Sequence, residues 1–158
     1  MSGSTTTRMK MLASVAAIVS LMLVATPSHA LDIKKMTLSN GATLLVSEQH
    51  QLPMVTMMIE FDAGTRRDPK GKEGLAELTA RSISQGTKTL TAPEFDQKVD
   101  FMGSSVGVSA GRDYSTAGMT SLKKYQTETL QLLAGILTEP GLRDADIERK
   151  RAEQVAVI

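Results

Sequence analysis

The sequence predicts an α+β fold in which helices pack on an antiparallel or mixed sheet. Two observations lead to this class, and a third concerns what stabilises it. Strand-like and helix-like stretches come in separate runs along the chain, which favours a segregated architecture over an alternating parallel one. Turn signals rich in glycine separate successive strand candidates, as they do in hairpins. The chain contains no cysteine, so no disulfide can form and the fold must rest on its apolar core.

The first thirty residues differ from the rest and predict a cleavable signal peptide. A polar start with two basic and no acidic residues precedes residues 11–25, an unbroken run of apolar and small residues. Pro27 follows, and Ser28-His29-Ala30 places small residues at the two positions that a signal peptidase reads. The alternative is an uncleaved anchor, but a spanning helix needs about 20 apolar residues and this run is shorter.

Removal of this segment changes the charge that bears on function. Arg8 and Lys10 leave and no acidic residue does, so the formal net charge falls from +1 to −1. A weakly acidic chain with 3% aromatic residues does not indicate a nucleic-acid partner, nor attraction to an anionic membrane after export. Because His29 leaves too, His50 is the only histidine of residues 31–158, which excludes two-histidine zinc sites within this domain.

The first half of the domain predicts three strands and a helix. Ile33–Leu38 and Thr43–Ser47 flank Asn40-Gly41, which predicts a two-residue hairpin turn with positive φ at both central residues. Met54–Phe61 is apolar enough for a buried strand, and residues 64–73 form a polar loop. Residues 74–84 then predict a helix that Gly86 terminates.

The second half predicts a helix, a hairpin and two further helices. Thr91-Ala92-Pro93-Glu94 has the spacing of a capping box and predicts a helix to about Met102. Ser104–Ala110 and Ser115–Ser121 predict a second hairpin, and Leu122–Thr138 has an amphipathic helical pattern. Asp144 or Asp146 is expected to cap a last helix that continues to Ile158 without a stop signal. The structural unit is therefore expected to be incomplete at Ile158.

Several short motifs follow one another in a characteristic order. They are Leu38–Gly41 (LSNG), Asp62–Arg66 (DAGTR), Glu73–Ala76 (EGLA), Ser84–Lys88 (SQGTK), Gly103–Val106 (GSSV) and Asp144–Arg149 (DADIER). This arrangement resembles the amino-terminal domain of the pitrilysin and mitochondrial processing peptidase family. The family consists of zinc endopeptidases with the inverted motif H-x-x-E-H. The resemblance implies the pitrilysin-type fold, present only in part, since the family requires two homologous domains around a chamber.

The resemblance also implies that the zinc site has been lost. In the family, two histidines after the EGLA landmark bind zinc and the glutamate between them is the general base. Here Glu77 takes the place of the first histidine, Ala80 that of the base and Arg81 that of the second histidine. Arginine is a fixed cation where a dication should bind. No zinc and no other cofactor is therefore expected, and Glu77 and Arg81 have the spacing of a helical ion pair.

The third zinc ligand of the family is a glutamate on a later helix. The matching position here is Val157, although Glu153 lies one turn earlier on the same face. The resemblance implies a catalytically inactive homologue that completes the chamber of an active peptidase sibling and holds peptide against a sheet edge. The predicted signal peptide, with no expected anchor, leads us to expect this protein in the periplasm. The alternative is an independent exported module that binds peptides or acts as a scaffold. A co-expressed sibling with an intact H-x-x-E-H motif would separate the two.

Processing between Ala30 and Leu31 is the first testable prediction. The basic start, the short apolar run and the small residues before Leu31 together predict cleavage by signal peptidase. Amino-terminal sequencing of the exported protein should begin at Leu31. A protein that keeps residues 11–25 and fractionates with membranes would contradict the prediction.

Overall fold

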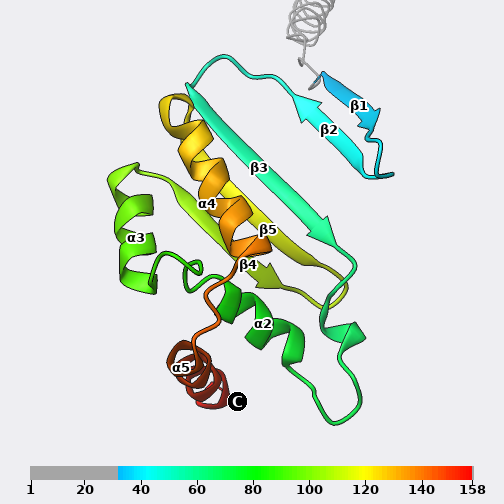
Figure 1. Cartoon of the computed structure of the whole chain (residues 1–158). Helices are drawn as coiled ribbons and strands as arrows, with labels where there is room; N and C mark the ends of the chain where they lie inside the picture. The colour runs from blue at the N-terminus through cyan, green and yellow to red at the C-terminus, as the bar shows by residue number, and fades with distance from the viewer. Residues whose placement is uncertain (1–31, 158) are drawn as a thin grey trace, which may run out of the picture. The chain divides into compact units, whose positions relative to one another are not determined.

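A computed structural model describes residues 32–157, and residues 1–31, with the expected signal peptide and its cleavage site, lie outside that range (Figure 1). The chain divides into two compact units, Met1–Gln49 and His50–Ile158. The described part of the first unit contains two antiparallel strands, and the second unit contains an antiparallel sheet with helices. The α+β class predicted from the sequence is therefore confirmed.

The described part of the first unit is a hairpin. Strand β1 (Ile33–Thr37) pairs antiparallel with β2 (Thr43–Ser47), with Thr37 opposite Thr43 next to the turn. Only Gly41 has a positive φ, +84°, so the expected turn with two left-handed residues is wrong. Instead the Gly41 amide donates to the Leu38 carbonyl and the Ala42 amide donates to Asn40 Oδ1. The Asn40 side chain thus stabilises a wider turn, which leaves only the glycine left-handed.

The second unit is built on a three-stranded antiparallel sheet. Its strands are β3 (Met54–Phe61), β4 (Ser105–Ala110) and β5 (Ser115–Leu122), in the order β3-β5-β4. On β5, buried and half-buried residues alternate along the strand, so one face is closed off from solvent. Strand β3 was expected to be buried, but it lies at the end of the sheet order and its residues alternate between half-buried and exposed.

Two helices supply most of the core over this sheet. They are α3 (Ala92–Phe101) and α4 (Gln126–Thr138), and Figure 1 shows α4 lying along the sheet. Apolar side chains from the helices and from the sheet pack against each other and are removed from water, and this burial stabilises the helix-on-sheet layer. The cluster consists of Phe95, Val99, Ala117, Met119, Leu133 and Ile136.

The ends of the helices confirm some sequence predictions and correct others. The capping box of α3 is present, with the Glu94 carboxylate accepting from the Thr91 amide at 2.8 Å. Helix α4 does not begin at Leu122, because this residue ends β5 and a 3₁₀ turn, η2 (Lys123–Tyr125), intervenes. Asp144 and Asp146 do not cap α5 (Asp144–Val155), but lie in its first turn, where acidic side chains complement the helix dipole.

Three hydroxyl groups, two of them fully buried, form a hydrogen-bonded network between the sheet and α4. Ser121 and Thr129 are fully buried and their hydroxyls lie 2.9 Å apart, while Ser104 Oγ lies 3.0 Å from Ser121 Oγ and 3.1 Å from Thr129 Oγ1. The network joins β5 and α4 to the residue that precedes β4. Buried hydroxyls need such partners, because an unsatisfied one costs about 1–3 kcal/mol.

Among the described residues no helix is both long and apolar enough to span a bilayer.

The hydroxyl network leads to a prediction about stability. Thr129→Val keeps the shape of the side chain but removes the hydroxyl, and we expect the free energy of unfolding to fall by about 1–2 kcal/mol. Urea denaturation of the full-length protein measures this. Ser121→Ala should cost less in the Thr129→Val background than in the wild type, because its partner is already gone. Strictly additive effects would show that the three hydroxyls do not act together.

Candidate functional site

The residues at the former zinc positions lie on helix α2 (Leu75–Ile83). Glu77 and Arg81 form an ion pair one turn apart, with Arg81 Nη2 at 2.7 Å and Nε at 3.0 Å from Glu77 Oε1. The pair predicted from the spacing is therefore present. Both side chains are about 40% exposed, so solvent screens their attraction and the pair contributes only about 0.2–0.5 kcal/mol.

Ala80, at the position of the catalytic base, faces the interior. It is 3% exposed and lines a pocket of about 380 Å³ between α2 and one end of the sheet. Its neighbours in the lining include Ile83 of α2, Val108 of β4 and Leu137 of α4. An apolar methyl group in an apolar pocket cannot accept a proton, so this position has become part of the packing.

The amino terminus of α2 is held by a side chain from the preceding loop. Asp68 Oδ2 accepts from the Gly74 amide at 2.8 Å, and Asp68 Oδ1 accepts from the Ala76 amide at 2.9 Å. Gly74 has a φ of +91°, a conformation that favours glycine. Asp68 thus provides the cap that the residue directly before the helix cannot provide, and its negative charge complements the helix dipole.

Backbone hydrogen bonds fix the loop before Asp68 to the turn that connects β4 and β5. A 3₁₀ turn, η1 (Thr65–Arg67), places the Arg66 amide 3.0 Å from the Arg112 carbonyl. Gly64 is required here, because a Cβ at this position would collide with the Arg112 backbone. Asp62 pairs with Arg67 and, at 2.6 Å, with Arg66. The hydrogen bond from Arg67 lowers the pKa of the Asp62 carboxyl below its usual value.

Helix α5 packs against α2 in an antiparallel direction. Arg149 Nη2 donates to Gln85 Oε1 at 2.7 Å beyond the end of α2, and Gln154 Nε2 donates to the Gly74 carbonyl at 3.1 Å at its start. The Glu153 carboxylate is engaged by two cations of its own helix, Lys150 at 2.9 Å and Arg149 at 3.2 Å. The hydrogen bond from Lys150 is the main cause of the lowered pKa of Glu153.

Val157, at the position of the third zinc ligand, does not lie within a helix. It follows the end of α5 in a turn and is 81% exposed. Its side chain has no donor atom for a metal, and Glu153 is already paired with two cations. His50 lies in the exposed segment before β3, not on α2.

The site therefore does not fit the zinc ion of the family. A metal needs ligands that give up a proton, and the second ligand position carries a permanent cation in Arg81. The first position, Glu77, is the partner of that cation. Within residues 32–157 no group of three or more histidine, cysteine, aspartate or glutamate side chains is arranged to hold a metal ion.

The fold and this helix define a peptidase-type domain that keeps the architecture of a zinc site without its ligands. The profile described as insulinase (peptidase family M16) matches residues 43–157, so the chain belongs to this family. The expected resemblance is confirmed, and this segment is a degenerate, non-catalytic homologue of the peptidase domain.

Curated relatives share about a quarter of their residues with this chain. A non-peptidase homolog, YmxG, of Helicobacter pylori is 27% identical over 73% of this chain and 27% of its own length. The mitochondrial cytochrome b-c1 complex subunit 1 of Bos taurus is 27% identical over 72% and 24% of the two chains. The bovine mitochondrial-processing peptidase subunit beta is 25% identical over 72% and 23%. The chain thus spans about a quarter of the length of these relatives.

Solved structures confirm the fold. An inactive peptidase M16 domain from Pseudomonas fluorescens superimposes with a TM-score of 0.74 at 24% identity, over 80% of this chain and 31% of the other. A protease from Helicobacter pylori gives a TM-score of 0.67 at 21% identity, over 78% and 30%. The pitrilysin-type architecture expected from the sequence is therefore present.

Sequence reasoning missed the residues that hold α2 in place. The sequence predicts only a surface loop around Asp68 and does not predict the contact of Gln154 with Gly74. The available signal was an aspartate followed by Gly71 and Gly74 before a helix with no capping side chain of its own. Such a helix needs acceptors for its first amides from elsewhere in the chain.

The contrast between Asp68 and Glu77 leads to the next prediction. Asp68→Ala removes two hydrogen bonds from the start of α2 and should lower the free energy of unfolding by about 1–2 kcal/mol. Glu77→Ala, in the exposed ion pair, should cost no more than about 0.5 kcal/mol. Asp68→Asn should fall between wild type and Asp68→Ala, because the amide oxygen still accepts one bond. Urea denaturation of the three variants measures the order, and equal losses for Asp68→Ala and Glu77→Ala would contradict it.

Proposed function

We propose that the protein is a non-catalytic partner subunit, which completes the peptide chamber of an active M16 sibling in peptide or protein processing. The observation that carries the proposal is the state of α2. Two of the three motif positions form an ion pair with each other and the third is buried among apolar groups. The scaffold around them is intact, with Asp68 at the helix start and α5 packed alongside. A scaffold that is retained without metal-binding side chains supports a role in forming the wall of a peptide chamber.

The names of two relatives support the partnership. Mitochondrial-processing peptidase subunit beta and cytochrome b-c1 complex subunit 1 are each subunits of larger assemblies by name. Both align with this chain over about the same length. A role for this protein as one subunit of a peptidase assembly extends that pattern to an exported protein. The proposed compartment is the periplasm, because of the signal peptide predicted over residues 1–30.

An independent exported module that binds peptides or acts as a scaffold is the second candidate. Strand β3 favours it, because β3 ends the sheet order of the second unit and carries exposed Met54 and Met58. An extended peptide can add to such a strand through its backbone. The two candidates differ in whether a sibling with an intact H-x-x-E-H motif co-purifies with the exported protein.

The proposed function predicts that the full-length protein alone binds no stoichiometric zinc and cleaves no peptide. Arg81 opposes a dication and Ala80 cannot activate water. Metal analysis after dialysis and a peptidase assay with and without chelator measure both properties. The expected result is well below one zinc per chain and no activity that the chelator removes.

The partner is tested in the same preparation. A sibling with the intact motif should co-purify in a fixed ratio, and its peptidase activity should fall when this protein is removed. Glu77→Ala serves as the matched control, since it should change neither zinc content nor the activity of the assembly. One zinc per chain, or activity lost on Glu77→Ala, would contradict the non-catalytic assignment. No sibling in the preparation would favour the independent module.

A further inference from the structure

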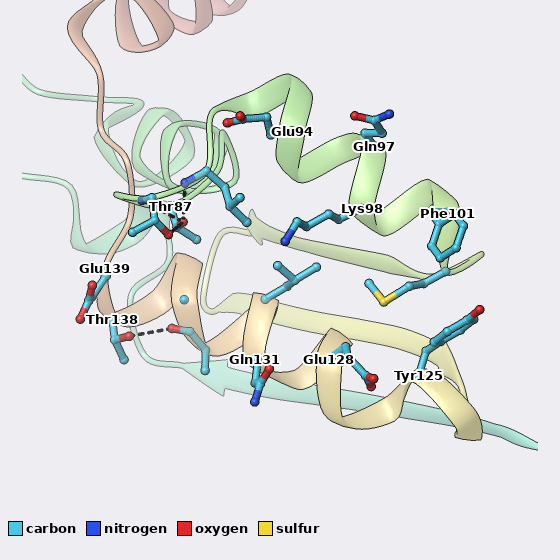
Figure 2. Close-up of a pocket in the computed structure, with 16 residues that line it drawn as sticks. Thr87, Glu94, Gln97, Lys98, Phe101, Tyr125, Glu128, Gln131, Thr138 and Glu139 are labelled. Carbon is cyan, nitrogen blue, oxygen red and sulfur yellow. Dashed lines mark hydrogen bonds between the residues drawn. The ribbon is translucent and has the colours of Figure 1, made fainter.

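Helices α3 and α4 enclose a groove that the degenerate site does not use. Its volume is about 970 Å³, and Figure 2 shows residues from both helices lining it. Leu90, Met102 and Leu132 contribute apolar surface, and Met102 is buried at 7% exposure. The groove has the size of a binding site and combines apolar surface with a few polar groups.

Two aromatic side chains lie at one end of the groove. Phe101 at the end of α3 is 80% exposed, and its ring centroid lies 6.4 Å from that of Tyr125. The Lys124 ammonium lies 4.4 Å from the Tyr125 ring and occupies part of its surface. A phenylalanine this exposed gains little from its own fold. Covering it with a partner recovers burial of about 25 cal/mol per Å² of apolar surface.

The charges of the groove have a defined order. Glu128 lies near the aromatic end and Glu139 near the opposite end, both on the α4 side, whereas Lys98 extends into the groove from α3 (Figure 2). None of the three forms an ion pair with another described residue. The fourth charge, Glu94, is already occupied by the capping box of α3. The sites left for a partner are therefore a carboxylate near each end and one ammonium between them.

The geometry of the walls selects a helical ligand. Both walls are helices, whose backbone groups are already bonded within each helix, so the lining offers side chains rather than a free strand edge. An amphipathic helix satisfies its own backbone groups and presents one row of side chains, which suits a groove lined by side chains. Glu139 directly follows the end of α4, eleven residues after Glu128, and this separation corresponds to about three turns and about 16 Å of helical rise.

We propose that this groove binds an amphipathic helix of another protein, with an apolar face and two basic side chains three turns apart. The apolar face would cover Phe101 and Leu132, and the basic groups would meet Glu128 and Glu139. An acidic or uncharged residue between them would face Lys98. The proposal goes beyond the partner-subunit function and does not depend on it, since no residue of α2 takes part.

A synthetic helix tests the proposal on the full-length protein. The probe is a labelled peptide of about 18 residues, with leucines on one face and two lysines eleven residues apart on the same face. Fluorescence anisotropy should give a dissociation constant of about 10 µM. The same peptide with both lysines replaced by glutamate should bind at least about tenfold more weakly. Phe101→Ala should weaken the lysine peptide by about tenfold, and circular dichroism should confirm that this variant folds.

A charge exchange provides the decisive control. Glu128→Lys combined with Glu139→Lys should reverse the preference, so that the glutamate peptide binds more tightly than the lysine peptide. Glu60→Lys combined with Glu148→Lys makes the same change of charge outside the groove and should leave the preference unchanged. Equal affinity for both peptides, or a reversal in the control variant as well, would overturn the proposal. So would dimerisation of the protein that Phe101→Ala abolishes without any peptide binding, because the groove would then belong to self-association.

Discussion

The position of helix α2 depends on one carboxylate, that of Asp68. This side chain accepts from the Gly74 and Ala76 amides and so fixes the helix to the preceding loop. The loop in turn bonds to the β4–β5 turn through the Arg66 amide. From its fixed start, α2 reaches β4, where Ser84 Oγ accepts from the Val108 amide, and the Gly74 carbonyl receives Gln154 of α5. The loop, the helix, the sheet and α5 are therefore connected through charge-assisted and backbone hydrogen bonds.

This dependence explains why the family remains recognisable after its chemistry is lost. The DAGTR landmark contains Gly64, which permits close approach to Arg112, and Asp62, which pairs with two arginines. In the SQGTK landmark Gly86 has a φ of +96° and the Thr87 hydroxyl accepts from the Leu90 amide. These residues hold the backbone in place and take no part in zinc binding. Selection for the scaffold alone is enough to preserve them.

Most elements were predictable, because periodicity and local turn chemistry decide them. The capping box at Thr91 and the strand pairing around the second hairpin are local patterns, and both are confirmed. The prediction for the turn at Asn40 is wrong because the Asn40 side chain accepts a hydrogen bond from the Ala42 amide, which favours a different backbone conformation. The predicted start of α4 is wrong because Leu122 pairs with Met54 in the sheet. Helical periodicity in the sequence does not indicate this contact between distant residues. At the site, the Glu77–Arg81 pair is local and was predicted, whereas the Asp68 and Gln154 contacts join distant residues.

The loss of the zinc site is difficult to reverse, because the substitutions that would restore it on α2 are energetically unequal. The exposed Glu77–Arg81 pair is worth only a few tenths of a kcal/mol, so it does not maintain the fold. Removing it would cost little, yet it would not restore a ligand. A working site would need two histidines, a glutamate in place of buried Ala80 and a third ligand in place of exposed Val157. The glutamate would carry its charge into an apolar pocket, which is costly unless a metal is already bound beside it. A return to catalysis would therefore need several substitutions together, and replacing Ala80 alone would destabilise the packing around α2.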